Sequence, residues 1–135
     1  MQEPPVPTAT VKLVTLSIAP KSAVKGTVTV NIPVGFHAYQ NPPMRDYEIP
    51  LKLESESKGV AIKVVYPAGA TIDFAGAQTS AYEGEVKISF SFTAPAKPGS
   101  YSLKLKTNYQ LCNSSNCWPP GSISTTVKYA VKKKS

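Results

Sequence analysis

Cys112 and Cys117 are the only two cysteines among the 135 residues of the chain, and their spacing makes them candidates for redox chemistry. The four residues between them are all Asn or Ser, which favour turns because their side chains hydrogen-bond to their own backbone. A hairpin loop of that length places the two cysteines opposite one another, with Cβ atoms close enough for a disulfide. The spacing therefore predicts a bridged hairpin.

Two interpretations of this bridge stay open on the residues alone. A ring this short contributes only about 2 kcal/mol through loop closure, and a chain of this length can bury a core without it. Strained or exposed disulfides are the easily reduced ones. Pro119 and Pro120 cannot donate to a sheet ladder, so we expect an irregular or edge segment at which the sulfurs are reachable. Spacing by itself slightly favours an inert structural disulfide over a redox-active pair.

Other chemistry for the pair has less support. His37 is the only histidine, and with two cysteines it falls short of the four ligands of a structural zinc site. Delivery of copper or zinc by Cys112, Cys117 and His37 is a third interpretation, although we expect no cofactor and no resident metal. No Lys, Arg or His lies within five residues of either cysteine, so the local sequence offers no cation to activate a thiolate. Asn113-Ser114-Ser115 matches a glycosylation acceptor, which would mean nothing in a bacterial protein.

Alternation of apolar and polar residues predicts short strands along most of the chain. The candidates are Thr10–Ala19, Lys25–Pro33, Ile49–Glu54, Ala61–Tyr66, Val86–Thr93, Tyr101–Tyr109 and Ile123–Val131. Each is bounded by Gly, Pro, Asn or Ser, and no segment keeps a helical period. About seven or eight such strands indicate an all-β sandwich or a related barrel with almost no helix.

Two segments do not fit a strand pattern. Gly35–Tyr47 contains Pro42-Pro43, and Pro67–Ala81 is rich in Gly, Ala and Thr. Long irregular connections in a compact domain are often functional. We therefore expect these two segments to form loops that serve the site.

The formal charge of +7 does not indicate a nucleic-acid-binding protein. Three of the positive charges come from Lys132, Lys133 and Lys134, and the other lysines alternate with apolar residues as on the solvent face of an antiparallel strand. A nucleic-acid-binding surface would cluster basic residues and interleave aromatics. The chain divides into a proline-rich lead-in over residues 1–9, one domain over residues 10–131, and a basic tail over residues 132–135 that would suit a membrane surface or a following domain.

Targeting segments are not evident in the sequence. No apolar run approaches the roughly 20 residues that a membrane-spanning helix needs. The first residues also lack the basic and then apolar layout of a signal peptide. For an exported protein we expect the leader to have been removed from this sequence.

The residues around the cysteines carry a resemblance to a known family. Tyr109-Gln110-Leu111-Cys112 followed by Cys117-Trp118-Pro119-Pro120 resembles the active-site segment of the N-terminal periplasmic domain of DsbD, a bacterial thiol:disulfide interchange protein. Further segments look like family landmarks in family order, namely Val34-Gly35-Phe36-His37-Ala38-Tyr39, Asn41-Pro42-Pro43, Tyr66-Pro67 and Tyr82-Glu83-Gly84-Glu85-Val86. The resemblance covers most of the chain and turns the balance toward a redox-active pair.

The resemblance implies an immunoglobulin-like β-sandwich with an exposed Cys-bearing hairpin and a cap loop, located in the periplasm and tethered to the inner membrane in the full-length parent. It also implies a protein-disulfide reductase component that takes electrons from a thioredoxin-like C-terminal domain of the same parent. The electrons then pass to periplasmic disulfide isomerases or cytochrome c maturation thioredoxins. We expect this domain to be monomeric. The alternative is a non-catalytic immunoglobulin-like interaction module with a structural disulfide.

The resemblance also assigns roles to residues. Cys117 forms the mixed disulfide with partners, and Cys112 resolves it. The cap loop that shields the pair until a partner docks comprises Asp73, Phe74, Ala75 and Gly76. The aromatic residues that line the site are Phe36, Tyr39, Tyr109 and Trp118. The chain departs from the family pattern in having four rather than five residues between the cysteines, and in having Ala75 where an aromatic follows the cap phenylalanine.

Overall fold

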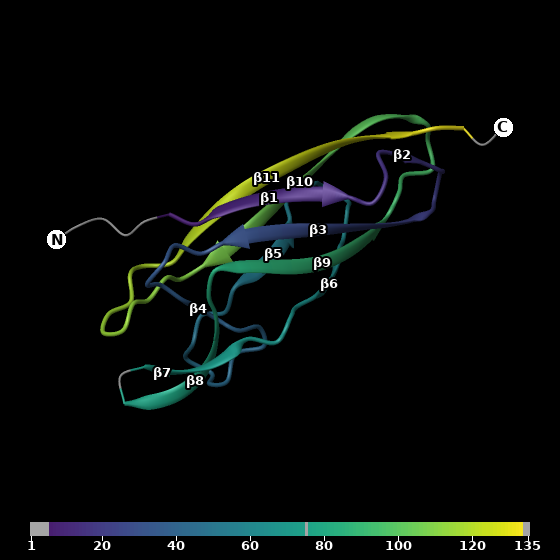
Figure 1. Cartoon of the computed structure of the whole chain (residues 1–135). Coiled ribbons are helices and arrows are strands. Elements are labelled where there is room, and N and C mark those ends of the chain that lie inside the picture. The colour runs from purple at the N-terminus through teal and green to yellow at the C-terminus, as the bar shows by residue number, and fades with distance from the viewer. Residues whose placement is uncertain (1–5, 75, 134–135) are drawn as a thin grey trace.

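The computed structural model describes residues 6–74 and 76–133, and this part of the chain is all-β without a helix (Figure 1). Consequently no helix of the described residues could cross a membrane. The eleven strands are β1 (Thr8–Leu13), β2 (Ser17–Ile18), β3 (Ala23–Asn31), β4 (Ala38–Tyr39), β5 (Lys52–Ser55), β6 (Lys63–Val65), β7 (Ala70–Phe74), β8 (Ala77–Tyr82), β9 (Glu85–Thr93), β10 (Gly99–Tyr109) and β11 (Gly121–Val131).

Two four-stranded sheets enclose the core. The first has the order β1-β3-β9-β6, and the second has the order β2-β11-β10-β5. Pairing is antiparallel throughout these sheets except between β11 and β2. A third, three-stranded sheet has the order β4-β8-β7. The prediction of an all-β, immunoglobulin-like sandwich is confirmed.

Strict alternation along the strands explains why the two sheets face one another. In β3, Val24, Gly26, Val28 and Val30 are buried, whereas the residues that alternate with them are exposed or half-exposed. The other sheet contributes buried side chains such as Leu103 and Leu105. Burying one such aliphatic side chain stabilises a fold by about 1.5–3 kcal/mol. The core is therefore large enough to hold the sandwich without help from a short disulfide ring.

Most predicted strands match the structure, but the first one is interrupted. Thr10–Ala19 splits into β1, which pairs with β3, and β2, which pairs with β11 in the opposite sheet. The chain crosses between the sheets at residues 14–16, where Val14 is 80% exposed. The segment predicted as one strand thus contributes one strand to each sheet. Of the predicted lead-in and tail, residues 1–5 and 134–135 lie outside the described part, and β1 already begins at Thr8.

The prediction that Pro67–Ala81 lacks strands is wrong. This segment forms most of the β7–β8 hairpin, in which Ala70 pairs with Ala81 and Phe74 pairs with Ala77. Its small residues conceal the alternation, because Ala and Gly mark neither an apolar nor a polar face. Gly35–Tyr47 is mainly irregular, as expected, and contributes only the two residues of β4.

The β7–β8 hairpin and the loop between β10 and β11 lie at one end of the sandwich (Figure 1). The β7–β8 hairpin and the yellow-green loop that joins β10 to β11 project toward the same end in Figure 1. The β10–β11 ladder runs from the Gly99–Val131 pair to the Tyr109–Gly121 pair, so it carries the connecting loop out beyond the sheet. That loop contains both cysteines.

Candidate functional site

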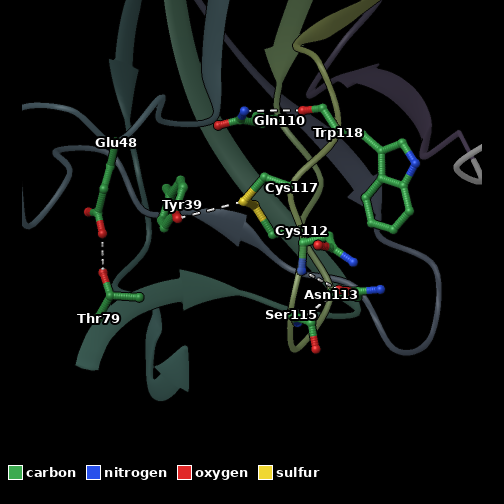
Figure 2. Close-up of a disulfide and its surroundings, with 10 residues drawn as sticks. Tyr39, Glu48, Thr79, Gln110, Cys112, Asn113, Ser115, Cys117 and Trp118 are labelled. Atoms are coloured by element: carbon green, nitrogen blue, oxygen red, sulfur yellow. Dashed lines mark hydrogen bonds between the residues drawn. A yellow bond between two sulfur atoms is a disulfide. The ribbon is translucent and has the colours of Figure 1, made fainter. Parts of the chain in front are cut away.

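The two cysteines form a disulfide across the neck of the loop between β10 and β11 (Figure 2). Their sulfurs are 2.05 Å apart and their Cα atoms 4.0 Å apart. Two backbone hydrogen bonds flank the bridge, since Asn113 donates to the carbonyl of Asn116 at 2.8 Å and Trp118 donates to the carbonyl of Leu111 at 3.0 Å. Cys112 and Cys117 are therefore a non-hydrogen-bonded antiparallel pair, the arrangement in which opposite residues approach most closely.

The turn inside the ring is built by an asparagine, as the sequence predicts. The Oδ1 of Asn113 accepts hydrogen bonds from the backbone amides of Ser115 at 2.9 Å and Asn116 at 2.7 Å. Side-chain bonding of this kind replaces backbone bonds in a tight turn. Local sequence is thus enough to bring the cysteines together.

The two sulfurs differ in their surroundings. Cys112 is completely buried, whereas Cys117 is exposed. The backbone of Cys112 also pairs with His37, because the His37 amide donates to the Cys112 carbonyl at 2.8 Å and the Cys112 amide donates back at 3.0 Å. Cys112 therefore lies between two neighbouring segments, and Cys117 lies at the free edge. The expectation that the sulfurs are reachable holds for Cys117 only.

Tyr39 is the predicted lining residue that contacts the bridge. Its hydroxyl lies 3.9 Å from the sulfur of Cys117 (Figure 2). The ring is held on β4, which pairs with β8, and the Tyr39 carbonyl accepts a hydrogen bond from the amide of Leu51. Burial raises the pKa of Tyr39 above its usual value, and the negative charge of Glu48 adds to this effect. The hydroxyl thus keeps its proton near neutral pH and can donate to sulfur.

The remaining predicted aromatics occupy two different places. Phe36 and Trp118 pack together with ring centroids 5.3 Å apart, and Gln110 holds the Trp118 carbonyl through its Nε2 at 3.1 Å. Tyr109 instead lies over Gly121, where an added Cβ would come within 2.8 Å of the Tyr109 hydroxyl oxygen. A larger residue at position 121 would therefore displace the end of the Tyr109 side chain. Tyr109 packs against the core and supports the base of the cysteine hairpin.

The predicted cap residues form the tip of the β7–β8 hairpin. Asp73 and Phe74 belong to β7, Gly76 lies in the turn with a φ of 82°, and Ala75 lies outside the described residues. That positive φ favours glycine. The half-buried ring of Phe74 packs edge-on against the ring of His37, with centroids 5.2 Å apart. The cap therefore reaches Cys112 through His37.

Two buried polar residues lie at this end, of which the sequence suggested His37 only as a metal ligand beside the cysteines and did not suggest Glu48. His37 is 5% exposed, and burial lowers the pKa of its imidazole, an effect that the carboxylate of Glu83 partly offsets. Glu48 is also 5% exposed, and its carboxylate accepts hydrogen bonds from the amides of Met44 and Arg45 and from the hydroxyl of Thr79. Glu48 thus ties the loop after Tyr39 to strand β8.

The sequence offered little signal for these two residues. His37 is 75 positions from Cys112, and Glu48 is 31 positions from Thr79. Only the pairing of distant segments brings them into contact. No group of three or more His, Cys, Asp or Glu side chains within residues 6–74 and 76–133 is arranged to hold a metal ion.

Comparison with solved structures places the fold. The N-terminal periplasmic domain of ScsB from Proteus mirabilis superposes with a TM-score of 0.67 at 15% identity, covering 89% of this chain and 46% of that one. The reduced N-terminal domain of DsbD from Neisseria meningitidis superposes with a TM-score of 0.52 at 18% identity, covering 79% of this chain and 82% of that one. The chain thus spans about half the length of the ScsB domain. At these identities the likeness is one of fold.

Sequence comparison identifies the family. No curated protein matches the chain. The sequence does match the family described as thiol:disulfide interchange protein DsbD, N-terminal, over residues 3–128. That range includes both cysteines, the segment around His37 and Tyr39, and the β7–β8 hairpin. The chain therefore belongs to the DsbD N-terminal domain family of thiol:disulfide interchange proteins.

Proposed function

We propose that this domain carries electrons by thiol–disulfide exchange through Cys112 and Cys117, with Cys117 as the sulfur that reacts with partners. The observation that carries the proposal is the unequal burial of the two cysteine residues, since Cys117 is exposed and Cys112 is completely buried. Exchange proceeds by attack of a thiolate on a sulfur that it can reach. A purely structural bridge has no need of this asymmetry.

The exchange can be written with its electrons balanced. In the oxidised domain, a donor thiolate attacks the sulfur of Cys117 and the Cys112 sulfur leaves as a thiolate. The donor's second thiol then displaces Cys117, so the donor becomes a disulfide and this domain gains two electrons and two protons. In the opposite direction, the Cys117 thiolate attacks an acceptor disulfide, and Cys112 resolves the mixed disulfide. The donor therefore needs a pair of thiols, and the acceptor needs a disulfide.

The residues around the bridge support a guarded site. The ring of Phe74 packs on His37, and His37 is paired to Cys112 by backbone hydrogen bonds. The cap comprises Asp73, Phe74, Ala75 and Gly76, and it protects the pair from small oxidants until a partner docks. Tyr39 donates to the sulfur of Cys117, while Phe36 and Trp118 form an aromatic wall and Tyr109 braces the hairpin.

Family membership supports the choice of partners. We propose that a thioredoxin-like C-terminal domain of the same parent reduces the Cys112–Cys117 bridge, in a parent tethered to the inner membrane. The acceptors are then thioredoxin-fold proteins of the periplasm, namely disulfide isomerases or cytochrome c maturation thioredoxins. The domain acts as a monomer over residues 10–131, as the reductase component of that system.

Trapping of mixed disulfides tests this proposal. Cys112→Ser removes the resolving sulfur, so the variant should accumulate a mixed disulfide with an oxidised thioredoxin-fold protein on a non-reducing gel. Cys117→Ser removes the exposed sulfur and should trap none, which makes it the matched control. A mixed disulfide formed by Cys117→Ser and absent from Cys112→Ser would invert the two roles.

The reduction potential separates this function from a non-catalytic immunoglobulin-like module. A structural bridge lies below about −300 mV, whereas an exchange-active bridge lies higher. Equilibration against a glutathione buffer, followed by alkylation and mass measurement, gives the oxidised fraction. A bridge that stays oxidised at every ratio of the buffer would favour the structural role.

A further inference from the structure

A hollow of about 480 Å³ opens beside the cysteine hairpin. Its apolar walls include Val34, Phe36 and Ile72, and its polar lining includes Asp73, Glu83 and Ser114. Asp73 belongs to the cap strand β7, and Ser114 lies inside the disulfide ring. The hollow is therefore shared by the two segments that shape the candidate site.

The two carboxylates of the hollow have no cation of their own. Asp73 and Glu83 are both exposed, and neither takes part in an ion pair with any described residue. The ion pairs of the described chain engage Glu48, Glu54 and Glu85 instead. Two unpaired negative charges therefore face one opening.

A buried polar group in the same lining also lacks a partner. His37 is 5% exposed, and its Nε2 is buried without a hydrogen-bond partner among the described residues. An unsatisfied buried polar atom costs a fold free energy, and a partner group can offset this cost only if docking exposes the atom. Burial lowers the pKa of His37 and keeps the ring uncharged near neutral pH, so it does not repel a cation. His37 thus adds no positive charge to the lining of the hollow.

Charge along the chain is also distributed unevenly. Residues 33–50, 68–85 and 108–121, which build this end, contain five acidic residues and a single base, Arg45. The Nη1 of Arg45 lies 3.6 Å from Oε2 of Glu48, so its charge is already engaged. All fourteen lysines lie outside these ranges, although Lys87, two residues past the second range, pairs with Glu85 at 3.7 Å. The cysteine end of a strongly basic protein is therefore locally acidic.

We propose that this hollow receives a lysine or arginine side chain that stands beside the reacting cysteine of a protein partner. The inference rests on the proposed function and adds the chemistry by which a partner is chosen. The aliphatic stem of the side chain lies along Val34 and Ile72, and its cationic end lies between Asp73 and Glu83. A local field of this sign attracts cationic reactants and slows anionic ones.

Small thiols of different charge test the local electrostatic field of Asp73 and Glu83 directly. The oxidised protein is reduced with cysteamine, which is cationic, 2-mercaptoethanol, which is neutral, and 2-mercaptoethanesulfonate, which is anionic. The rate of each is compared between wild type and the double variant Asp73→Asn, Glu83→Gln, so that the intrinsic reactivities of the thiols cancel. The pair Glu54→Gln, Glu56→Gln removes two negative charges at and just after β5, outside the lining of the hollow, and is the control for a general change of charge.

At low salt the Asp73→Asn, Glu83→Gln variant should react with cysteamine roughly three- to tenfold more slowly than wild type, react faster with the anionic thiol, and be unchanged with the neutral one. The effect should largely vanish in about 0.5 M salt. The control pair should leave all three rates nearly as they are. Equal changes for the three thiols, or an equal effect of the control pair, would refute the claim that Asp73 and Glu83 attract cationic reactants to the hollow.

A protein reductant tests whether a lysine or arginine side chain of the partner enters the hollow. A reduced thioredoxin-fold protein with a lysine or arginine next to its reactive cysteine is compared with its own glutamine variant. Loss of that base should slow reduction of the wild-type domain roughly fivefold, and should have little effect on Asp73→Asn, Glu83→Gln. Fast reaction without this coupling would refute the inference and leave the proposed function intact. No reaction with any thioredoxin-fold protein, together with intact selectivity among small thiols, would refute the proposed function alone.

Discussion

Unequal reactivity of the two thiols is the sharpest consequence of the fold. When the reduced protein meets a limiting amount of iodoacetamide, the structure predicts that Cys117 is modified long before Cys112. Cys117 is exposed at the edge of the hairpin, whereas Cys112 is fully buried and paired to His37. A reagent can reach Cys112 only after that pairing opens.

The size of the preference follows from the bonds that must break. The His37 and Cys112 backbones exchange two hydrogen bonds, at 2.8 and 3.0 Å. At about 1 kcal/mol net for each bond, opening costs about 2 kcal/mol. Since about 1.4 kcal/mol corresponds to a factor of ten, Cys112 should react about 30-fold more slowly than Cys117. Separation of Phe74 from His37 would add to this cost, so the factor is a lower bound.

Peptide mapping measures the ratio within one molecule. After an acid quench and trypsin digestion, both cysteines fall in the peptide Thr107–Lys128, and fragmentation locates the adduct. The same reaction in denaturant is the control, because the unfolded chain removes the difference in burial. A native ratio close to the denatured one would refute the argument that the His37 pairing protects Cys112.

Three further perturbations probe the surroundings of the bridge. Phe74→Ala should speed oxidation of the reduced protein by a small oxidant, followed by mass measurement after alkylation, because the ring that covers His37 is removed; unchanged kinetics would contradict the cap assignment. Thr79→Val deletes a 2.6 Å hydrogen bond to the buried Glu48 carboxylate and should lower the free energy of unfolding, measured in urea, by about 1.5–3 kcal/mol. Thr79→Ser keeps the hydroxyl and should keep most of that stability. Equal stability of the two variants would show that this hydrogen bond does not stabilise the fold. Burial lowers the pKa of His37 in the folded state, so the unfolded chain binds the proton more readily. The free energy of unfolding should therefore fall as pH drops below about 6.5, by at most about 1.4 kcal/mol per pH unit. A His37→Gln variant with the same pH profile as wild type would show that other groups cause this slope.

Strand alternation was enough to predict the sandwich but not how its strands are divided. The buried positions of β3 and β9 alternate strictly, so the sequence shows their buried face and their bounds to within two residues. The small residues of β7 and β8 carry no such signal, and the hairpin therefore escaped prediction. The split between β1 and β2 was also hidden, because an apolar residue is equally suited to either sheet.

The cysteine pair illustrates the same division between sequence and structure. The sequence by itself determined that Cys112 and Cys117 close a short ring, because the side chain of Asn113 makes the turn by accepting the backbone amides of Ser115 and Asn116. That information is local. It specifies that a bridge can form, and it says the same of both sulfurs.

Only the tertiary structure decided which sulfur is exposed and what surrounds it. His37 lies 75 residues before Cys112 and covers it through backbone pairing, and Phe74 approaches from a third segment. Tyr39 reaches the sulfur of Cys117 because β4 pairs with β8. Burial and charge at a sulfur depend on whichever segments the fold packs around it, and these segments are far apart in the sequence. The turn therefore makes the disulfide, and the sandwich makes its two ends chemically different.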